Sequence, residues 1–184
     1  MADKGLAGSK ILMVIAPEQF RDEELLEPKK IFLDAGAQVA VASTSRGTAT
    51  GMLGAKVEPD LLIGQARAAD YDAVVVVGGM GSPEHLWDNQ ELHSLLQQCQ
   101  KDGKILAAIC LSGAVLAKAG LLAGKQATVW AMPESLAALQ QGKAQYIKKP
   151  VVQDGRLITA EGPEAAKDFG HAVVNELARK ASRV

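Results

Sequence analysis

The sequence predicts an α/β fold in which a parallel sheet is covered by helices on both faces. Continuous apolar runs at 10–16, 71–79 and 105–109 are typical of strands buried on both sides of such a sheet. Helix-compatible segments at 22–35 and 90–102 alternate with these runs, and each is followed by a glycine that can end a helix. Alternating strands and helices favour parallel pairing through right-handed crossovers.

The other elements follow from local signals along the chain. We predict a loop at 17–21 and a cap by Asp22 on the first helix, which contains Pro28. Residues 1–184 are expected to form one domain, with 1–9 a short mobile tail. The remaining predicted elements are a strand at 38–43, a small hairpin or extended excursion at 45–60, helices at 113–119 and 133–141, a strand at 127–130, a hairpin at 150–160 around a DG turn, and a last helix at 164–180.

Composition excludes several classes of partner. Twenty basic and 21 acidic residues leave a net charge of -1, which gives no electrostatic footprint for nucleic acid or an acidic membrane surface. No apolar run approaches the roughly 20 residues that cross a bilayer. Two cysteines far apart in sequence, without a signal peptide, favour a reducing cytoplasm over a disulfide scaffold.

Cys110 stands where an apolar strand at 105–109 gives way directly to a helix-compatible run. Ala108 and Ser112 are small, and Gly113 follows, as a sharp strand–nucleophile–helix turn requires. The helix dipole and free backbone N–H groups there are expected to favour a thiolate. The alternative is that Cys110 only fills core space, as most free cysteines do. Cys99, on an amphipathic helix without such a turn, is assigned no chemistry.

Topology predicts which segments share the site, because ligands bind beyond the carboxyl ends of parallel strands. The loop after Ala16, the glycine pair 78–79 and the Cys110 turn should meet at that edge. The N–H groups of Gly79 and Leu111 could then form an oxyanion hole. The first loop leads to Glu23 and Glu24, whose plainer interpretation is favourable charge in a first helical turn.

Cofactor and metal signals are weak. The glycines at 78, 79 and 81 lack the third glycine and helix start of a dinucleotide fingerprint, which argues against NAD. His85, His93 and His171 show no metal-ligand spacing, so we expect no metal and no cofactor. The lysines at 143–149 are read as a solvated face.

Four motifs together resemble the DJ-1/ThiJ/PfpI superfamily, in the class I glutamine-amidotransferase-like group. They are DEELLEP at 22–28, YDAVVVVGG at 71–79, AAICLSG at 107–113, and DGRLITAEGP at 154–163 followed by Asp168 and Phe169. The resemblance implies a flavodoxin-like three-layer sandwich. The C-terminal motif is more similar to the DJ-1 branch than to the archaeal protease branch.

The resemblance also implies roles for individual residues. Cys110 takes the place of the nucleophile, Glu24 that of the active-site acid, and Gly79 and Leu111 those of the oxyanion donors. Glu24 would be protonated and donate a hydrogen bond to the Cys110 sulfur, because a carboxylate and a thiolate side by side repel each other. The pocket is expected to include three further residues, namely Gly78, Ser112 and Trp130.

Two family histidines are missing from this chain. Protease-like members carry one directly after the cysteine, where this chain has Leu111. Members of the DJ-1 branch place one on the strand after the elbow helix, and the stretch 128–133 has none. Glu24 would therefore have to move protons alone, which weakens the peptidase and the glyoxalase III readings.

The sequence and the resemblance leave three possible functions. The first is a cytoplasmic stress-protection protein that acts through Cys110 on small α-oxoaldehydes, as a glyoxalase III or deglycase type enzyme. The second is a redox sensor or chaperone-like protein whose Cys110 oxidises to a sulfinic acid. The third is an intracellular peptidase or amidase. The expected partners are a small carbonyl substrate or an oxidant, and the resemblance implies a homodimer or higher homo-oligomer.

Overall fold

A computed structural model describes residues 5–183 and confirms the three-layer α/β architecture. Its main sheet has seven strands in the order β11-β12-β8-β7-β1-β3-β6. The strands of this sheet are β1 (Lys10–Val14), β3 (Gln38–Ser43), β6 (Leu61–Leu62), β7 (Ala73–Val76), β8 (Ile105–Ile109), β11 (Val151–Asp154) and β12 (Leu157–Ala160).

All neighbours in this sheet pair in parallel except β11 and β12, which form the antiparallel hairpin predicted at 150–160. From β1 the chain moves to β3 on one side and then returns to β7 on the other. The strand order therefore reverses between β1 and β7, and a ligand site is expected at the carboxyl ends of these strands.

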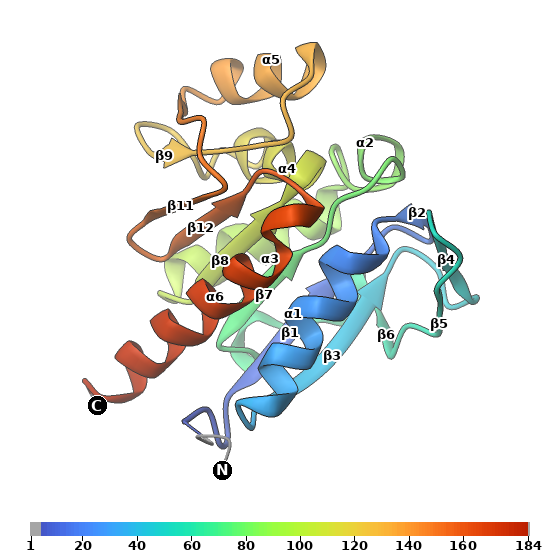
Figure 1. Ribbon diagram of the computed structural model, residues 1–184, viewed down its shortest axis with the longest axis vertical. Helices are drawn as coiled ribbons and strands as arrows, with labels where there is room; N and C mark the ends of the chain where they lie inside the picture. The colour runs from blue at the N-terminus through green and yellow to red at the C-terminus, as the bar shows by residue number, and fades with distance from the viewer. Residues whose placement is uncertain (1–4, 184) are drawn as a thin grey trace.

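Helices lie on both faces of the sheet (Figure 1). α1 (Asp22–Asp34) and α6 (Ala166–Ala181) run side by side in front of it, and α3 (Gln90–Lys101) lies behind. The remaining helices are α2 (Ser82–His85), α4 (Gly113–Lys118) and α5 (Pro133–Gln141), with 3-10 turns at Ile63–Gln65, Ala68–Asp70, Cys110–Ser112 and Pro163–Ala165. No helix among residues 5–183 has the length and apolarity needed to cross a membrane.

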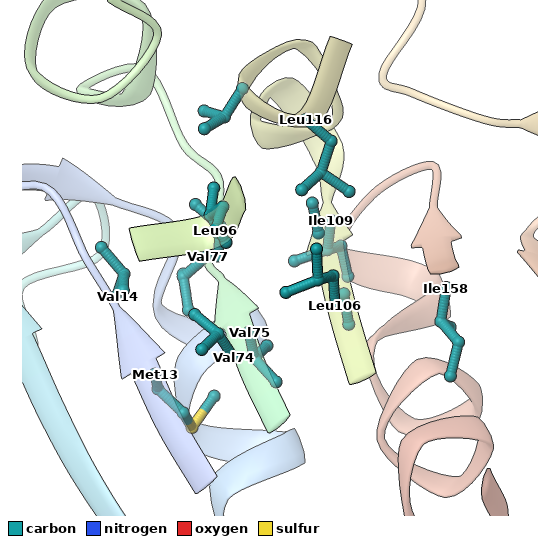
Figure 2. Packing of buried hydrophobic residues seen from close by; sticks show 14 of the residues in the cluster. Met13, Val14, Val74, Val75, Val77, Leu96, Leu106, Ile109, Leu116 and Ile158 are labelled. Carbon is teal, nitrogen blue, oxygen red and sulfur yellow. The ribbon is translucent and has the colours of Figure 1, made fainter. Parts of the chain in front are cut away.

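Apolar side chains of the central strands form the core (Figure 2). Val74 and Val75 of β7 point to opposite faces, as successive strand residues do, and both are fully buried. Ile109, the last residue of β8, is buried as well. Cys110 therefore directly follows a strand that core packing holds in place.

The excursion at 45–60 is a hairpin, as predicted, of β4 (Ala49–Gly51) and β5 (Lys56–Val57). The prediction of a loop at 17–21 is wrong for its middle residues, because β2 (Glu18–Phe20) pairs in parallel with β4. The cap predicted for Asp22 is also wrong. Asp22 is the first helical residue, and its carboxylate accepts hydrogen bonds from Leu53 N (2.8 Å) and Ala55 N (2.8 Å), which ties the hairpin to α1.

Two further expectations differ from the structure. The strand predicted at 127–130 is short, because only β9 (Gln126–Ala127) pairs with β10 (Gln145–Tyr146). The N–H of Thr128 then donates to the side-chain hydroxyl of Thr159 instead of to a backbone carbonyl. Of the tail expected over 1–9, residues 1–4 lie outside the described part. Leu6 is buried, and its N–H donates to Ala35 O (3.1 Å), so this part of the segment contacts the domain.

Candidate active site

Cys110 is the turning residue between β8 and the elbow helix. Its φ is 60°, in the left-handed region that residues other than glycine rarely adopt, whereas the preceding Ile109 is extended. A single 3-10 turn, Cys110–Ser112, leads directly into α4. This strained turn is the geometry predicted from the small residues around Cys110, and such strain is typical of functional sites.

Buried hydrogen bonds hold the turn. The Ser112 hydroxyl donates to Val77 O (2.6 Å) and also contacts the Ser82 hydroxyl (2.7 Å). The indole N–H of Trp87 donates to Leu111 O (2.8 Å). Ser112, which we expected in the pocket, is fully buried behind the turn instead. Its role is to fix the elbow to the end of β7.

Glu24 projects from the first turn of α1 toward Cys110. Its side chain is fully buried, and Oε2 accepts a hydrogen bond from Gly78 N (2.9 Å). A Cβ atom on Gly78 would lie 2.6 Å from Glu24 Oε2 and 2.7 Å from Cys110 Cβ. Gly78 therefore lies between the Glu24 carboxyl and Cys110, and its lack of a side chain lets these two groups approach each other. It does not line the pocket.

Burial raises the pKa of Glu24 to about 7, although hydrogen bonds with the Cys110 thiol and with the Gly78 N–H act to lower it. The second carboxyl oxygen, Oε1, is buried and has no hydrogen-bond partner of acceptable geometry among residues 5–183. A carboxylate oxygen in that position would be costly, whereas a protonated oxygen needs only one acceptor. Glu24 thus favours its neutral form up to about neutral pH.

The pKa of the Cys110 thiol is raised by burial and by the negative charge of Glu24, while hydrogen bonds from the N–H groups of Leu111 and Gly79 lower it. This differs from the thiolate that the helix position alone led us to expect. Because the two groups repel when both are ionised, Glu24 and Cys110 titrate as a pair that carries at most one negative charge near neutral pH.

Gly79 brings its N–H group to the sulfur through a turn that only glycine can make. Its φ is 107°, and a Cβ there would lie 2.4 Å from both Arg21 N and Gln19 O. Its N–H and that of Leu111 both act to lower the pKa of the Cys110 thiol. The two donors proposed for the oxyanion hole therefore flank the same atom.

A pocket with a volume of about 130 Å³ opens over Cys110. Its lining residues are Arg21, Met52, Gly79, Met80, Cys110, Leu111, Trp130 and Pro163. Trp130 was predicted there and is half-exposed at the rim. Sequence reasoning missed Arg21, Met52, Met80 and Pro163. The one signal for Arg21 was its place directly before the helix that carries Glu24.

No histidine among the described residues lines this pocket. His93 contacts Trp87 O (2.8 Å) behind the elbow, and His171 is exposed on α6. His85 Nε2 lies 3.2 Å from Glu18 Oε1, and with Glu84 these groups place their possible ligand atoms within 4.8 Å of one another. Among residues 5–183 this surface cluster is the one group of three or more His, Cys, Asp or Glu side chains with such spacing, and it lies outside the pocket.

Comparisons with known proteins point to one family. The sequence profile of the DJ-1/PfpI family matches residues 9–176. An uncharacterized protein of Methanocaldococcus jannaschii is 44% identical over 95% of this chain and 85% of its own. A deglycase of Pyrococcus horikoshii is 31% identical over 84% of this chain and 90% of its own.

A comparison with solved structures points to the same family. The crystal structure of a ThiJ/PfpI domain protein from Brachyspira murdochii superposes with a TM-score of 0.88 at 37% identity. The match covers 92% of this chain and 96% of that one. The chain belongs to the DJ-1/PfpI family.

Proposed function

We propose that the protein converts small α-oxoaldehydes to hydroxy acids through Cys110, with Glu24 as the proton carrier. The observation that carries this proposal is the buried Glu24 carboxyl, which meets Cys110 across Gly78 at a strained elbow beneath a small pocket. The name of the Pyrococcus horikoshii relative, a deglycase, supports chemistry on carbonyl compounds.

The first step is attack of the Cys110 thiolate, formed when the pair has lost one proton and Glu24 holds the other, on the aldehyde carbon. A C–S bond forms, the carbonyl electron pair moves to oxygen, and that oxygen takes the proton of Glu24. While negative charge develops on it, the oxygen would be stabilised by the N–H groups of Gly79 and Leu111. The product of this step is a hemithioacetal.

The second step needs one group that both removes and returns a proton. The Glu24 carboxylate takes the proton from the carbon bonded to sulfur and delivers it to the neighbouring carbonyl carbon, while the proton of the hemithioacetal hydroxyl passes to the neighbouring carbonyl oxygen. The product is a thioester of a 2-hydroxy acid. Water then hydrolyses the thioester and releases the Cys110 thiol. The overall reaction adds one water and needs no oxidant. A carboxyl with a pKa of about 7 can act in both directions near neutral pH.

Methylglyoxal is the direct test substrate. We expect wild type to consume it and form lactate, and we expect Cys110→Ala to lose the activity completely. Glu24→Gln should lose at least about a hundredfold in kcat, because its amide cannot carry the proton. Cys99→Ala is the matched control and should retain the wild-type rate. Equal lactate formation by wild type and Cys110→Ala would remove the proposal.

A second candidate is a redox sensor, supported by the same acid. A sulfinate on Cys110 could accept hydrogen bonds from protonated Glu24 and from the N–H groups of Gly79 and Leu111. Two equivalents of peroxide would supply the two oxygen atoms, each leaving one water. Mass spectrometry after mild peroxide treatment should then find two added oxygens on Cys110 and none on Cys99. Such selective oxidation in a protein that does not turn over methylglyoxal favours the sensor.

No observation favours the peptidase or amidase, since no histidine of residues 5–183 lines the pocket. The cytoplasmic location and the homo-oligomer stay predictions from the sequence.

A further inference from the structure

Arg21 gives the pocket a feature that the proposed chemistry does not use. Of the side chains that line the pocket in the described part of the chain, only that of Arg21 carries a permanent charge. The others are the cysteine, apolar or aromatic side chains, and a glycine. A cation at the mouth of a small apolar pocket is a specificity element, because it fixes the orientation of any anionic ligand.

Hydrogen bonds hold both the backbone and the guanidinium group of Arg21. Its backbone N–H donates to Gly78 O (3.0 Å), and the side chain of any residue other than glycine at 79 would collide with that nitrogen. Its guanidinium binds Glu23 through two bonds, from Nε to Oε2 (2.8 Å) and from Nη2 to Oε1 (3.1 Å). The side chain is only 29% exposed. Arg21 is therefore held beside the two glycines of the active site.

Glu23 leaves one edge of the guanidinium free. A guanidinium has five N–H donors, and Glu23 accepts from Nε and Nη2 only. Within residues 5–183, Nη1 donates no hydrogen bond to a side chain or to the backbone. The edge formed by Nη1 and Nη2 matches the spacing of two carboxylate oxygens.

Arg21 also lies within electrostatic reach of the reacting groups. The hydrogen bond to Glu23 raises its pKa most, and the negative charges of Glu24 and Cys110 raise it further. An anion bound to Arg21 would therefore sit close to the sulfur. The small volume of the pocket, about 130 Å³, leaves room for only a short spacer between the anion and the reacting carbon.

We propose that the free edge of Arg21 binds the carboxylate of the substrate, so that the site prefers small α-oxoaldehydes that carry a carboxylate on the ketone carbon, on the side away from the reacting aldehyde. This inference rests on the proposed function, because it assigns the substrate class of the same site. Glu23 holds the guanidinium in place and offsets part of its charge. The exposed Met52, Met80 and Trp130 form the apolar remainder of the rim.

Two alkylating reagents of nearly equal size test the charge preference without turnover. Iodoacetate and iodoacetamide both form a C–S bond to Cys110 with loss of iodide, and they differ in carrying a carboxylate or an amide. The measured quantity is the rate of iodoacetate at Cys110 divided by the rate of iodoacetamide at Cys110. This ratio is then divided by the same ratio for a free small thiol. We expect this corrected ratio to fall on the order of tenfold in Arg21→Gln.

Two further variants separate the charge from the fold. Arg21→Lys keeps the charge but loses the planar fork, so its ratio should lie between those of wild type and Arg21→Gln. Glu23→Gln removes the competing carboxylate and should raise the ratio. The iodoacetamide rate and the melting temperature of each variant report whether the elbow is intact.

The outcomes for this inference and for the proposed function are distinct. A ratio that is the same in wild type, Arg21→Gln and Arg21→Lys overturns the role of Arg21, even where Cys110 reacts readily with both reagents. Failure of both reagents to modify Cys110 faster than Cys99 instead overturns the reactive cysteine itself, and the proposed function with it.

Discussion

The two cysteines of this chain are both buried, yet their surroundings differ in every respect that matters for chemistry. Cys99 lies on the inner face of α3 with no exposed surface, and burial raises the pKa of its thiol to about 11. Cys110 directly follows β8 with a positive φ, borders a pocket, and has Glu24 and two N–H donors near its sulfur.

Burial acts on both thiols, whereas a buried acid that titrates near neutral pH lies beside only one of them. Burial raises the pKa of both thiols, because a low-dielectric environment disfavours the charged form. At Cys110 a neighbouring acid also resists ionisation, and its pKa is about 7. Since the pair can lose one proton near neutral pH, a fraction of the molecules can hold that charge on sulfur. At Cys99 the positive charge of Lys104 lowers the pKa of the thiol, and the negative charge of Asp102 raises it further.

The largest expected effect is in the reactivity of the two thiols. Under native conditions we expect iodoacetamide to modify Cys110 at least about a hundredfold faster than Cys99, which reacts only when α3 opens. Digestion and mass spectrometry measure both rates in one sample. In denaturant the two rates should become equal. Equal rates in the native protein would mean that the elbow does not activate its cysteine.

The pH dependence of the same reaction sharpens the comparison. In wild type the Glu24–Cys110 pair has lost its first proton above about pH 7, so the rate at Cys110 should rise up to that pH and then level off. Glu24→Gln has no proton to share. Its thiol no longer faces the negative charge that raises the pKa of Cys110 in wild type, so its rate should not level off near pH 7 and should keep rising through pH 9. Superimposable profiles would contradict the pairing of the two groups.

The glycine turn that serves Cys110 predicts an effect of intermediate size. Gly79→Ala combines a positive φ with contacts of 2.4 Å to backbone atoms, and should lower the free energy of unfolding by about 2–4 kcal/mol. Gly120→Ala is the matched control, because Gly120 has a φ of 79° but open space around it. It should cost only about 1–2 kcal/mol. Chemical unfolding measures both, and equal losses would mean that the contacts at Gly79 relax freely.

The parts of the site that the sequence could predict are those that strand ends dictate. Apolar runs followed directly by glycines or by a small-x-Cys-x-small pattern placed Gly79 and Cys110 at one edge of the sheet. The family resemblance then selected Glu24 over Glu23. In the structure Glu24 is fully buried, whereas Glu23 pairs with Arg21 at the surface.

The parts that the sequence could not predict depend on contacts between distant segments. Asp22 was expected to cap its own helix, but Leu53 N and Ala55 N take its carboxylate, and no local pattern records that hairpin contact. Ser112, two residues after the cysteine, was expected in the pocket. Its hydroxyl instead faces Val77 and Ser82, behind the elbow. Arg21 has no motif of its own, and its role follows only from the pocket around it.

The smallest expected effect is on stability, and it reverses the ranking of the two cysteines. Cys99→Ala removes a sulfur that packing surrounds on all sides, so the cavity left behind should lower the free energy of unfolding by roughly 1–2 kcal/mol. The Cys110 sulfur already borders an open pocket, and its removal also relieves the burial of a polar group beside Glu24. We therefore expect Cys110→Ala to cost less than about 1 kcal/mol. Urea unfolding of both variants at one pH measures the difference. A larger loss for Cys110→Ala would mean that this cysteine contributes to the core as Cys99 does, and would weaken the assignment of its strained turn to function.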